Sequence, residues 1–201
     1  MKLYYKPGAC SLASHIALEE AGLPYQTEAV DLKTKVTATG QDYWQINPKG
    51  YVPALRLDSG ELLTEGPAIL QYVADQAPAR WLAPAPATLA RYQLQSWLNF
   101  IGTELHRSCT AFFHPQAQDD WKAIARANLD RRLAYVDEQL QGRPYLTGDG
   151  FTVADAYLFT VLSWMKPIGV DLSGWPQIVA FQARVADRPA VQAVLKAEGL
   201  V

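Results

Sequence analysis

The chain has 201 residues, of which 49% are hydrophobic, and its formal net charge at pH 7 is −2. This length and composition suit one domain or two compact ones with a sizeable core, and they argue against disorder. The charge balance provides no basic stripe for nucleic acid. There is no apolar run of about 18 residues that would predict a membrane span. No signal peptide is recognisable, so we expect a cytoplasmic protein.

The first strand and helix of the chain meet at a cysteine. Residues 2–5 are an apolar, aromatic run typical of a strand, Pro7 and Gly8 end it, and a helical pattern begins at about Ser11. Cys10 therefore lies at a helix start, where unpaired N–H groups and the helix dipole favour negative charge, so a stabilised thiolate is expected. The alternative is a small buried residue in a tight turn.

The remaining thiol and imidazole groups restrict the chemistry further. Ala13 stands where a second cysteine would resolve a disulfide intermediate, so a resolving thiol must come from outside, and glutathione is a candidate. Cys109 lies far along the chain, and a structural disulfide with Cys10 is not expected. The histidines show no metal-ligand spacing, so no metal is predicted; they are His15, His106 and His114.

The first 77 residues predict an α/β domain. After the helix from Ser11, which Gly22 ends, the pattern predicts a strand at 25–30, a short helix at 41–46, a hairpin at 51–57 and 61–63, and a helix at 67–77. This order of βαβ, α, ββ and α is the thioredoxin-like arrangement, with a mixed four-stranded sheet.

Residues 78–87 are rich in proline and alanine and predict a linker, with Trp81 and Leu82 docked in an apolar pocket.

Residues 88–201 predict an all-helical second domain. In the helix expected at 88–113, a buried seam is formed by Leu94, Leu98, Ile101 and Leu105. A polar stripe lies roughly opposite and consists of Asn99, Thr103 and His106. Either the stripe is a solvated face, or it lines a cleft beside the first domain.

The later helices of this domain are expected at 119–141, 156–164, 175–186 and 189–197. Thr152 and Asp155 form a capping box ahead of the second of these. Its apolar sequence predicts the centre of the core.

Four motifs lie along essentially the whole chain: YYKPGACS at 4–11, NPKGYVPAL at 47–55, TEGPAI at 64–69 and FTVAD at 151–155. Together they resemble the cytosolic glutathione transferases, in particular the bacterial beta class. The resemblance implies a glutathione-binding thioredoxin-like domain, a helical domain with a hydrophobic co-substrate site, and a homodimer. It also implies conjugation of the glutathione thiolate to hydrophobic electrophiles, with catalytic roles for Cys10, Ser11 and His106.

The resemblance further implies a glutathione-binding set made of Cys10, Lys35, Val52, Pro53, Glu65, Gly66, Asn99, Thr103 and His106. In this set, the Val52 backbone pairs with the cysteinyl part of glutathione beside a cis Pro53, and Glu65 takes the ligand ammonium. Gly66 replaces the serine of many relatives, so a hydroxyl is lost while the backbone donor remains.

Four further roles stay open on the resemblance. Lys35 either meets the glycyl carboxylate or is an ordinary loop lysine. Tyr5 is either a hydroxyl donor or a packed aromatic residue, and Trp164 lines the co-substrate cleft or belongs to the core. Asn99 or Glu104 reaches either its own glutathione or that of the dimer mate.

Two other functions are compatible with the residues. Cys10 as nucleophile would give a glutathione-dependent thiol-disulfide oxidoreductase or reductive dehalogenase. Glutathione-dependent thiol transferase or peroxidase activity is also compatible with the transferase. A non-catalytic binder of glutathione or hydrophobic ligands would reuse the same scaffold.

Overall fold

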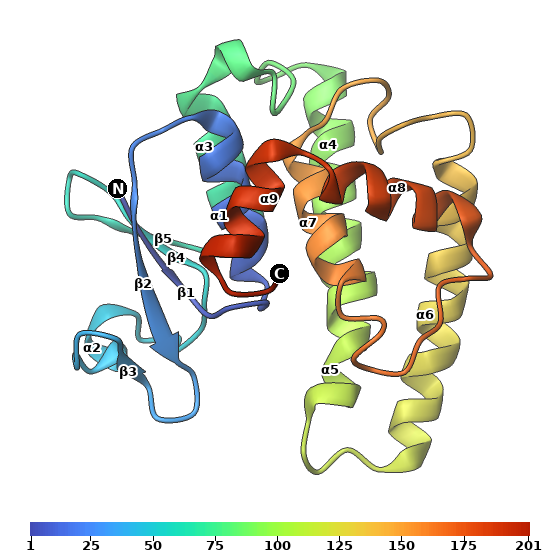
Figure 1. The fold of residues 1–201 in the computed structure, drawn as a ribbon, viewed down its shortest axis with the longest axis horizontal. Coiled ribbons are helices and arrows are strands. Elements are labelled where there is room, and N and C mark those ends of the chain that lie inside the picture. The colour runs from blue at the N-terminus through green and yellow to red at the C-terminus, as the bar shows by residue number, and fades with distance from the viewer. The chain divides into compact units, whose positions relative to one another are not determined.

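The structure is a computed structural model that describes residues 1–201, and it divides into two compact units (Figure 1). The first unit consists of Met1–Ala83 together with Arg188–Val201, and the second is Pro84–Asp187. The first contains a mixed sheet flanked by helices and the second is helical, so the predicted fold class is confirmed.

The sheet of the first unit has five strands in the order β3-β2-β1-β4-β5. Their bounds are β1 Lys2–Tyr5, β2 Gln26–Asp31, β3 Val36–Thr37, β4 Ala54–Arg56 and β5 Leu62–Thr64. Strand β1 is parallel to β2 and antiparallel to β4, while β4 and β5 form the expected hairpin. The prediction of four strands is wrong by one, because the polar stretch after β2 turns back and β3 pairs with its end.

The helices of the first unit are α1 Ser11–Ala21, α2 Tyr43–Ile46, α3 Gly66–Gln76, the 3₁₀-helix η1 Pro78–Arg80 and α9 Pro189–Ala197. Helices α1 and α3 pack against each other beside the sheet. Helix α1 ends as predicted, because Gly22 adopts φ 65° and its N–H donates to the Glu19 carbonyl 3.0 Å away.

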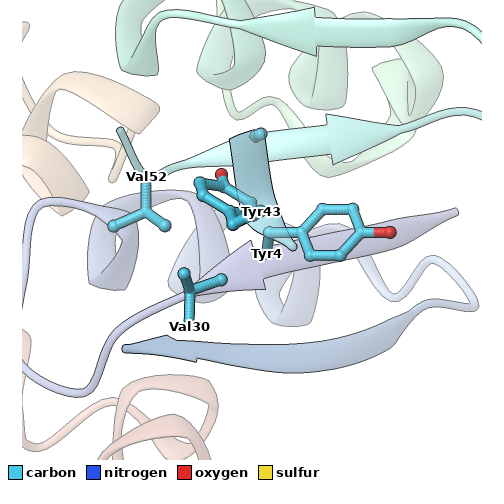
Figure 2. Close-up of a cluster of buried hydrophobic side chains, with 5 residues drawn as sticks. Tyr4, Val30, Tyr43 and Val52 are labelled. Carbon is cyan, nitrogen blue, oxygen red and sulfur yellow. The ribbon is translucent and has the colours of Figure 1, made fainter. Parts of the chain in front are cut away.

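Helix α2 packs on the sheet through a cluster of buried hydrophobic side chains (Figure 2). Tyr43 of α2 is fully buried and its ring lies 5.8 Å from that of Tyr4 on β1, next to Val30 of β2. Val52, just before β4, belongs to the same cluster and is 5% exposed. The cluster therefore fixes the backbone that leads into β4.

The C-terminal segment Arg188–Val201 belongs to the first unit. The prediction that residues 88–201 form the helical domain is wrong for this segment, because α9 packs against α1 of the first unit. The guanidinium of Arg188 donates to the Glu20 carboxylate of α1 over 2.5 and 2.9 Å.

A buried polar contact also attaches this segment to α1. Glu198 is 6% exposed, and its Oε1 lies 2.8 Å from Nδ1 of His15, which is 3% exposed. The other carboxylate oxygen of Glu198 accepts the Gly8 N–H at 2.9 Å. One carboxylate thus ties the chain end to both the turn before α1 and α1 itself.

The predicted linker is only partly as expected. Leu82 is 3% exposed and is buried as predicted, but Trp81 is 78% exposed. The docking prediction is wrong for Trp81, because η1 ends there in a left-handed turn with φ 57°.

The second unit contains α4 Leu89–Phe100, the π-helix η2 Ile101–His106, α5 Arg107–Phe113, α6 Asp119–Gln139, α7 Val153–Leu162 and α8 Pro176–Ala186. The first three form one continuous helical run, so the helix predicted at 88–113 is confirmed. Its seam of Leu94, Leu98, Ile101 and Leu105 is 0–1% exposed. Asn99 and Thr103 are exposed and His106 is half-buried, in agreement with the predicted polar stripe.

Helix α7 is buried along its whole length and begins with the predicted capping box. One oxygen of the Asp155 carboxylate accepts the N–H and hydroxyl of Thr152, both at 2.8 Å, and the other accepts the Leu146 N–H at 2.9 Å. Burial raises the pKa of Asp155 to about 6, although these donors act in the opposite direction. None of the helices in the chain is both long and apolar enough to cross a membrane.

Candidate functional site

Cys10 lies immediately before α1, but its thiol is neutral. The Sγ atom donates to the Val52 carbonyl over 3.1 Å, and the side chain is half-buried. Burial raises the pKa of Cys10 to about 11, against the lowering effect of the Cys10 and Ser11 N–H groups, and the Glu65 charge raises it further. The expectation of a stabilised thiolate is therefore wrong for this structure, because desolvation outweighs the helix-start donors.

Ser11 uses its hydroxyl to hold the turn before α1. The side chain is fully buried, and Oγ donates to the Lys6 carbonyl at 3.2 Å and accepts the Lys6 N–H at 3.1 Å. These bonds close the Pro7–Gly8 turn and so position Cys10. The expected catalytic role of Ser11 stays a prediction, while its observed contacts are with this turn.

The Val52–Pro53 peptide bond is cis, as the resemblance implied. The preceding Tyr51 carbonyl accepts from the Tyr43 hydroxyl at 2.7 Å and from the Asn47 amide at 2.8 Å. The Val52 N–H makes no hydrogen bond within the chain. Val52 therefore presents a free backbone donor next to a carbonyl that the Cys10 thiol already occupies.

Glu65 and Gly66 start α3 with an exposed carboxylate. Glu65 has a left-handed backbone with φ 69°, and its Oε1 accepts from Lys49 Nζ at 2.6 Å. Lys49 also donates to Thr64 Oγ1 at 3.1 Å. A Cβ added at Gly66 would come no closer than 3.9 Å to Pro53, so the position has room for a side chain. The sequence analysis missed Lys49, although it lies in the 47–55 motif.

Lys35 stabilises the loop that precedes Val52. Its Nζ donates to the Gly50 carbonyl at 2.8 Å and lies 5.3 Å from the centre of the Trp44 ring. A lysine ammonium has three donors, so this contact leaves donors for a ligand carboxylate. Contact with the glycyl carboxylate stays a prediction.

The second unit contributes a set of polar and aromatic side chains around His106. Its Nδ1 lies 2.7 Å from the hydroxyl of Tyr157 on α7, and the Trp164 ring lies 4.8 Å from the imidazole in an edge-on arrangement. Phe113 packs edge-on against Trp164 at 5.9 Å. Burial lowers the pKa of His106 to about 4, so the imidazole is neutral at neutral pH. Trp164 is half-buried, which leaves both of its proposed roles open.

Asn99 and Thr103 are placed one turn apart on the exposed face of α4 and η2. The Thr103 hydroxyl donates to the Asn99 carbonyl at 3.0 Å. Glu104 instead accepts from Arg132 of α6 at 2.7 Å within the same unit. Asn99 and Thr103 thus remain accessible in the second unit, whereas Glu104 already has a cationic partner.

Tyr5 and Cys109 have surroundings that differ from those of the residues above. The Tyr5 ring packs 5.6 Å from the ring of His15, and burial raises the pKa of its hydroxyl. Cys109 is fully buried and donates to the Leu105 carbonyl at 3.4 Å. Burial raises the pKa of Cys109 to about 12, in agreement with a non-catalytic helix residue.

Sequence reasoning also missed Tyr157, because nothing in the sequence connects it with His106 fifty-one positions earlier. No group of three or more His, Cys, Asp or Glu side chains is arranged to hold a metal ion.

A thioredoxin-like unit with a cis proline, followed along the chain by a helical unit, is the fold of the glutathione transferase class. The comparisons agree along the whole chain. Residues 8–76 match the family model "Glutathione S-transferase, N-terminal domain", and residues 100–189 match "Glutathione S-transferase, C-terminal domain". The chain therefore belongs to the glutathione transferase family.

Individual relatives are similar over their full length. Glutathione S-transferase GstA of Escherichia coli O157:H7 is 50% identical over 200 residues, which cover 100% of both chains. A sphingomonad glutathione S-transferase solved in complex with glutathione has a TM-score of 0.97 at 49% identity. The bacterial beta-class glutathione S-transferase of Sphingomonas chungbukensis also has a TM-score of 0.97, at 48% identity. Both alignments cover 100% of this chain and 100% of the solved chain.

Proposed function

We propose that the protein transfers glutathione to hydrophobic electrophiles. The thiolate sulfur of glutathione attacks an electrophilic carbon, a carbon–sulfur bond forms, and the leaving group departs with the electron pair. The observation that carries this proposal is the free Val52 N–H beside the cis Pro53, where the cysteinyl part of glutathione can pair with the backbone. Burial raises the pKa of the neighbouring Cys10 thiol to about 11, so Cys10 contributes almost no thiolate at neutral pH. Glutathione, whose free thiol resembles an ordinary cysteine thiol, then supplies the nucleophile.

Each proposed contact with glutathione uses a group whose surroundings support it. The Val52 N–H is free to pair with the cysteinyl part of the ligand, beside Pro53. The Glu65 carboxylate is exposed and takes the ligand ammonium in exchange for Lys49, while the N–H of Gly66 at the start of α3 takes the α-carboxylate. Lys35 takes the glycyl carboxylate.

The second unit contributes the remaining proposed contacts. Asn99 and Thr103 present exposed polar groups, and the neutral His106 donates a hydrogen bond to the glutathione sulfur. Trp164 and the aromatic residues around it offer an apolar surface for the electrophile.

The test compares Cys10→Ala with the unchanged protein in two assays. Conjugation is followed with an aryl halide such as 1-chloro-2,4-dinitrobenzene, and disulfide reduction with 2-hydroxyethyl disulfide and glutathione. We expect Cys10→Ala to retain conjugation, because Cys10 is not the nucleophile. Loss of both activities on this substitution would contradict the proposal.

A second candidate function is thiol transfer through Cys10. It is favoured by the hydrogen bond from Cys10 Sγ to the Val52 carbonyl, which puts the thiol beside the backbone proposed to bind the cysteinyl part. In this reaction Cys10 loses its proton and attacks a glutathionyl disulfide, and the departing thiolate takes up the proton. Intact-mass analysis after incubation with oxidised glutathione should then show one added glutathione, which Cys10→Ala would abolish.

We further infer a homodimer and a cytoplasmic location from the resemblance to the beta class. Analytical ultracentrifugation tests the dimer: a sedimenting mass twice that of the 22.3 kDa chain supports it, and a single-chain mass contradicts it. Fractionation of the source cells tests the location. Retention on immobilised glutathione without turnover of any electrophile or disulfide would instead indicate a non-catalytic binder.

A further inference from the structure

The two ring nitrogens of His106 have different surroundings. Nδ1 lies 2.7 Å from the Tyr157 hydroxyl, within hydrogen-bond distance. Nε2 makes no hydrogen bond within the chain. The rings of His106 and Tyr157 are almost perpendicular, at 85°, with their centres 6.0 Å apart. One nitrogen is therefore occupied by a fixed partner while the other remains available.

The local fold holds the Tyr157 hydroxyl in place. Tyr157 is 5% exposed and lies in α7, which is buried throughout and is capped by Asp155. Opposite it, the π-helix η2 carries Gly102, where an added Cβ would lie 3.5 Å from the Tyr157 hydroxyl. The Tyr157 hydroxyl therefore lies beside the backbone of η2 at Gly102. π-helical turns often occur where a helix presents a functional side chain.

The chemistry of the pair determines which atom carries the proton. A phenolic O–H is a good donor, and the unprotonated nitrogen of a neutral imidazole is a good acceptor. Burial lowers the pKa of His106 to about 4, so at neutral pH the ring has one N–H and one acceptor nitrogen. If Nδ1 accepts from Tyr157, the single ring proton must lie on Nε2.

We propose that Tyr157 is a positioning residue for the transferase reaction: its hydroxyl donates to Nδ1 of His106 and so keeps the imidazole proton on Nε2, the nitrogen left to donate to the glutathione sulfur. The inference rests on the role proposed above for His106. Tyr157 acts through the orientation and tautomer of the imidazole, in the way that an outer partner fixes a histidine at other sites.

The first test is Tyr157→Phe, which removes the hydroxyl and keeps the buried ring. We expect kcat/KM for aryl halide conjugation to fall by about tenfold, the lower end of what outer partners of functional histidines contribute, with the KM for glutathione unchanged. Tyr145→Phe is the matched control, because Tyr145 is a buried tyrosine of the same unit whose ring packs on Phe151 rather than on His106. An equal loss in both variants would overturn the proposal.

The second test observes the tautomer directly by ¹⁵N NMR of the histidine side chains at pH 7. Substitution of His106 assigns its signals. We expect the Nε2–H form to dominate in the unchanged protein, and the Nδ1–H form to become populated in Tyr157→Phe. A dominant Nδ1–H form in the unchanged protein, or no change on substitution, would overturn the proposal. If Tyr157 had a purely structural role, its substitution would not change the tautomer populations of His106.

A double-mutant cycle separates the inference from the function on which it rests. In His106→Gln the side-chain amide takes the place of Nε2–H and leaves no Nδ1, so adding Tyr157→Phe should cause no further loss. Further loss in the double variant would overturn the positioning role alone, since His106 would still be required. Full activity in both His106→Gln and His106→Ala would instead refute the proposed role of His106, and the role of Tyr157 with it.

Discussion

The protonation state of Cys10 can be tested by its rate of alkylation with iodoacetamide as the pH is raised. With a pKa of about 11, about one Cys10 in a thousand is a thiolate at pH 8, compared with about one in four for an ordinary thiol. A thiolate of higher pKa is intrinsically more nucleophilic, here by roughly tenfold, and this partly offsets the roughly 200-fold smaller thiolate fraction. We therefore expect alkylation at pH 8 to be about 10- to 20-fold slower than that of free cysteine.

The shape of the pH curve is more informative than the single rate. The rate should rise about tenfold per pH unit up to pH 10 without a plateau, because the thiolate fraction is still small there. Cys10→Ala gives the background from buried Cys109, and the protein unfolded in guanidinium should titrate like an ordinary thiol. A plateau below pH 8 in the folded protein would refute the reasoning, since it would show that the donors at the start of α1 outweigh burial.

Two further predictions concern stability. Asp155→Asn should lower the free energy of unfolding by about 3 kcal/mol, because an amide replaces a buried carboxylate that accepts three hydrogen bonds. Urea unfolding measures this loss, with the exposed Asp149→Asn as control, and a loss below about 1 kcal/mol would contradict it. Glu198→Gln should cost about 2 kcal/mol and speed amide exchange at Gly8, whose N–H donates to Glu198. Unchanged exchange at Gly8 would show that this contact is not maintained in solution.

The features that the sequence predicted well depend on neighbours along the chain. The seam from Leu94 to Leu105 follows from helical spacing, and the Thr152 and Asp155 cap follows from a pattern three residues long. The hairpin of β4 and β5 was recognisable from the turn at Asp58, Ser59 and Gly60. In each case the residues that decide the structure are also close in the sequence.

The features that the sequence did not predict depend on contacts between distant residues. The Cys10 thiol is neutral because the fold buries it against Val52, and this desolvation has no signature in the residues next to Cys10. His15 and Glu198 are 183 positions apart, so neither could be identified as the other's partner. The placement of α9 in the first unit follows from contacts of this kind.

The two shifted pKa values together restrict how the glutathione thiolate is stabilised. Burial raises the pKa of Cys10 to about 11 and lowers the pKa of His106 to about 4, so at neutral pH neither side chain carries a charge. The thiolate is then stabilised by neutral hydrogen-bond donors instead of an imidazolium. Between pH 5.5 and 9, kcat/KM should consequently rise through a single ionisation, that of glutathione itself. A second inflection near pH 6.5 that disappears in His106→Gln would mean that His106 is charged at the start of the reaction, and would contradict the neutral donor inferred from its burial.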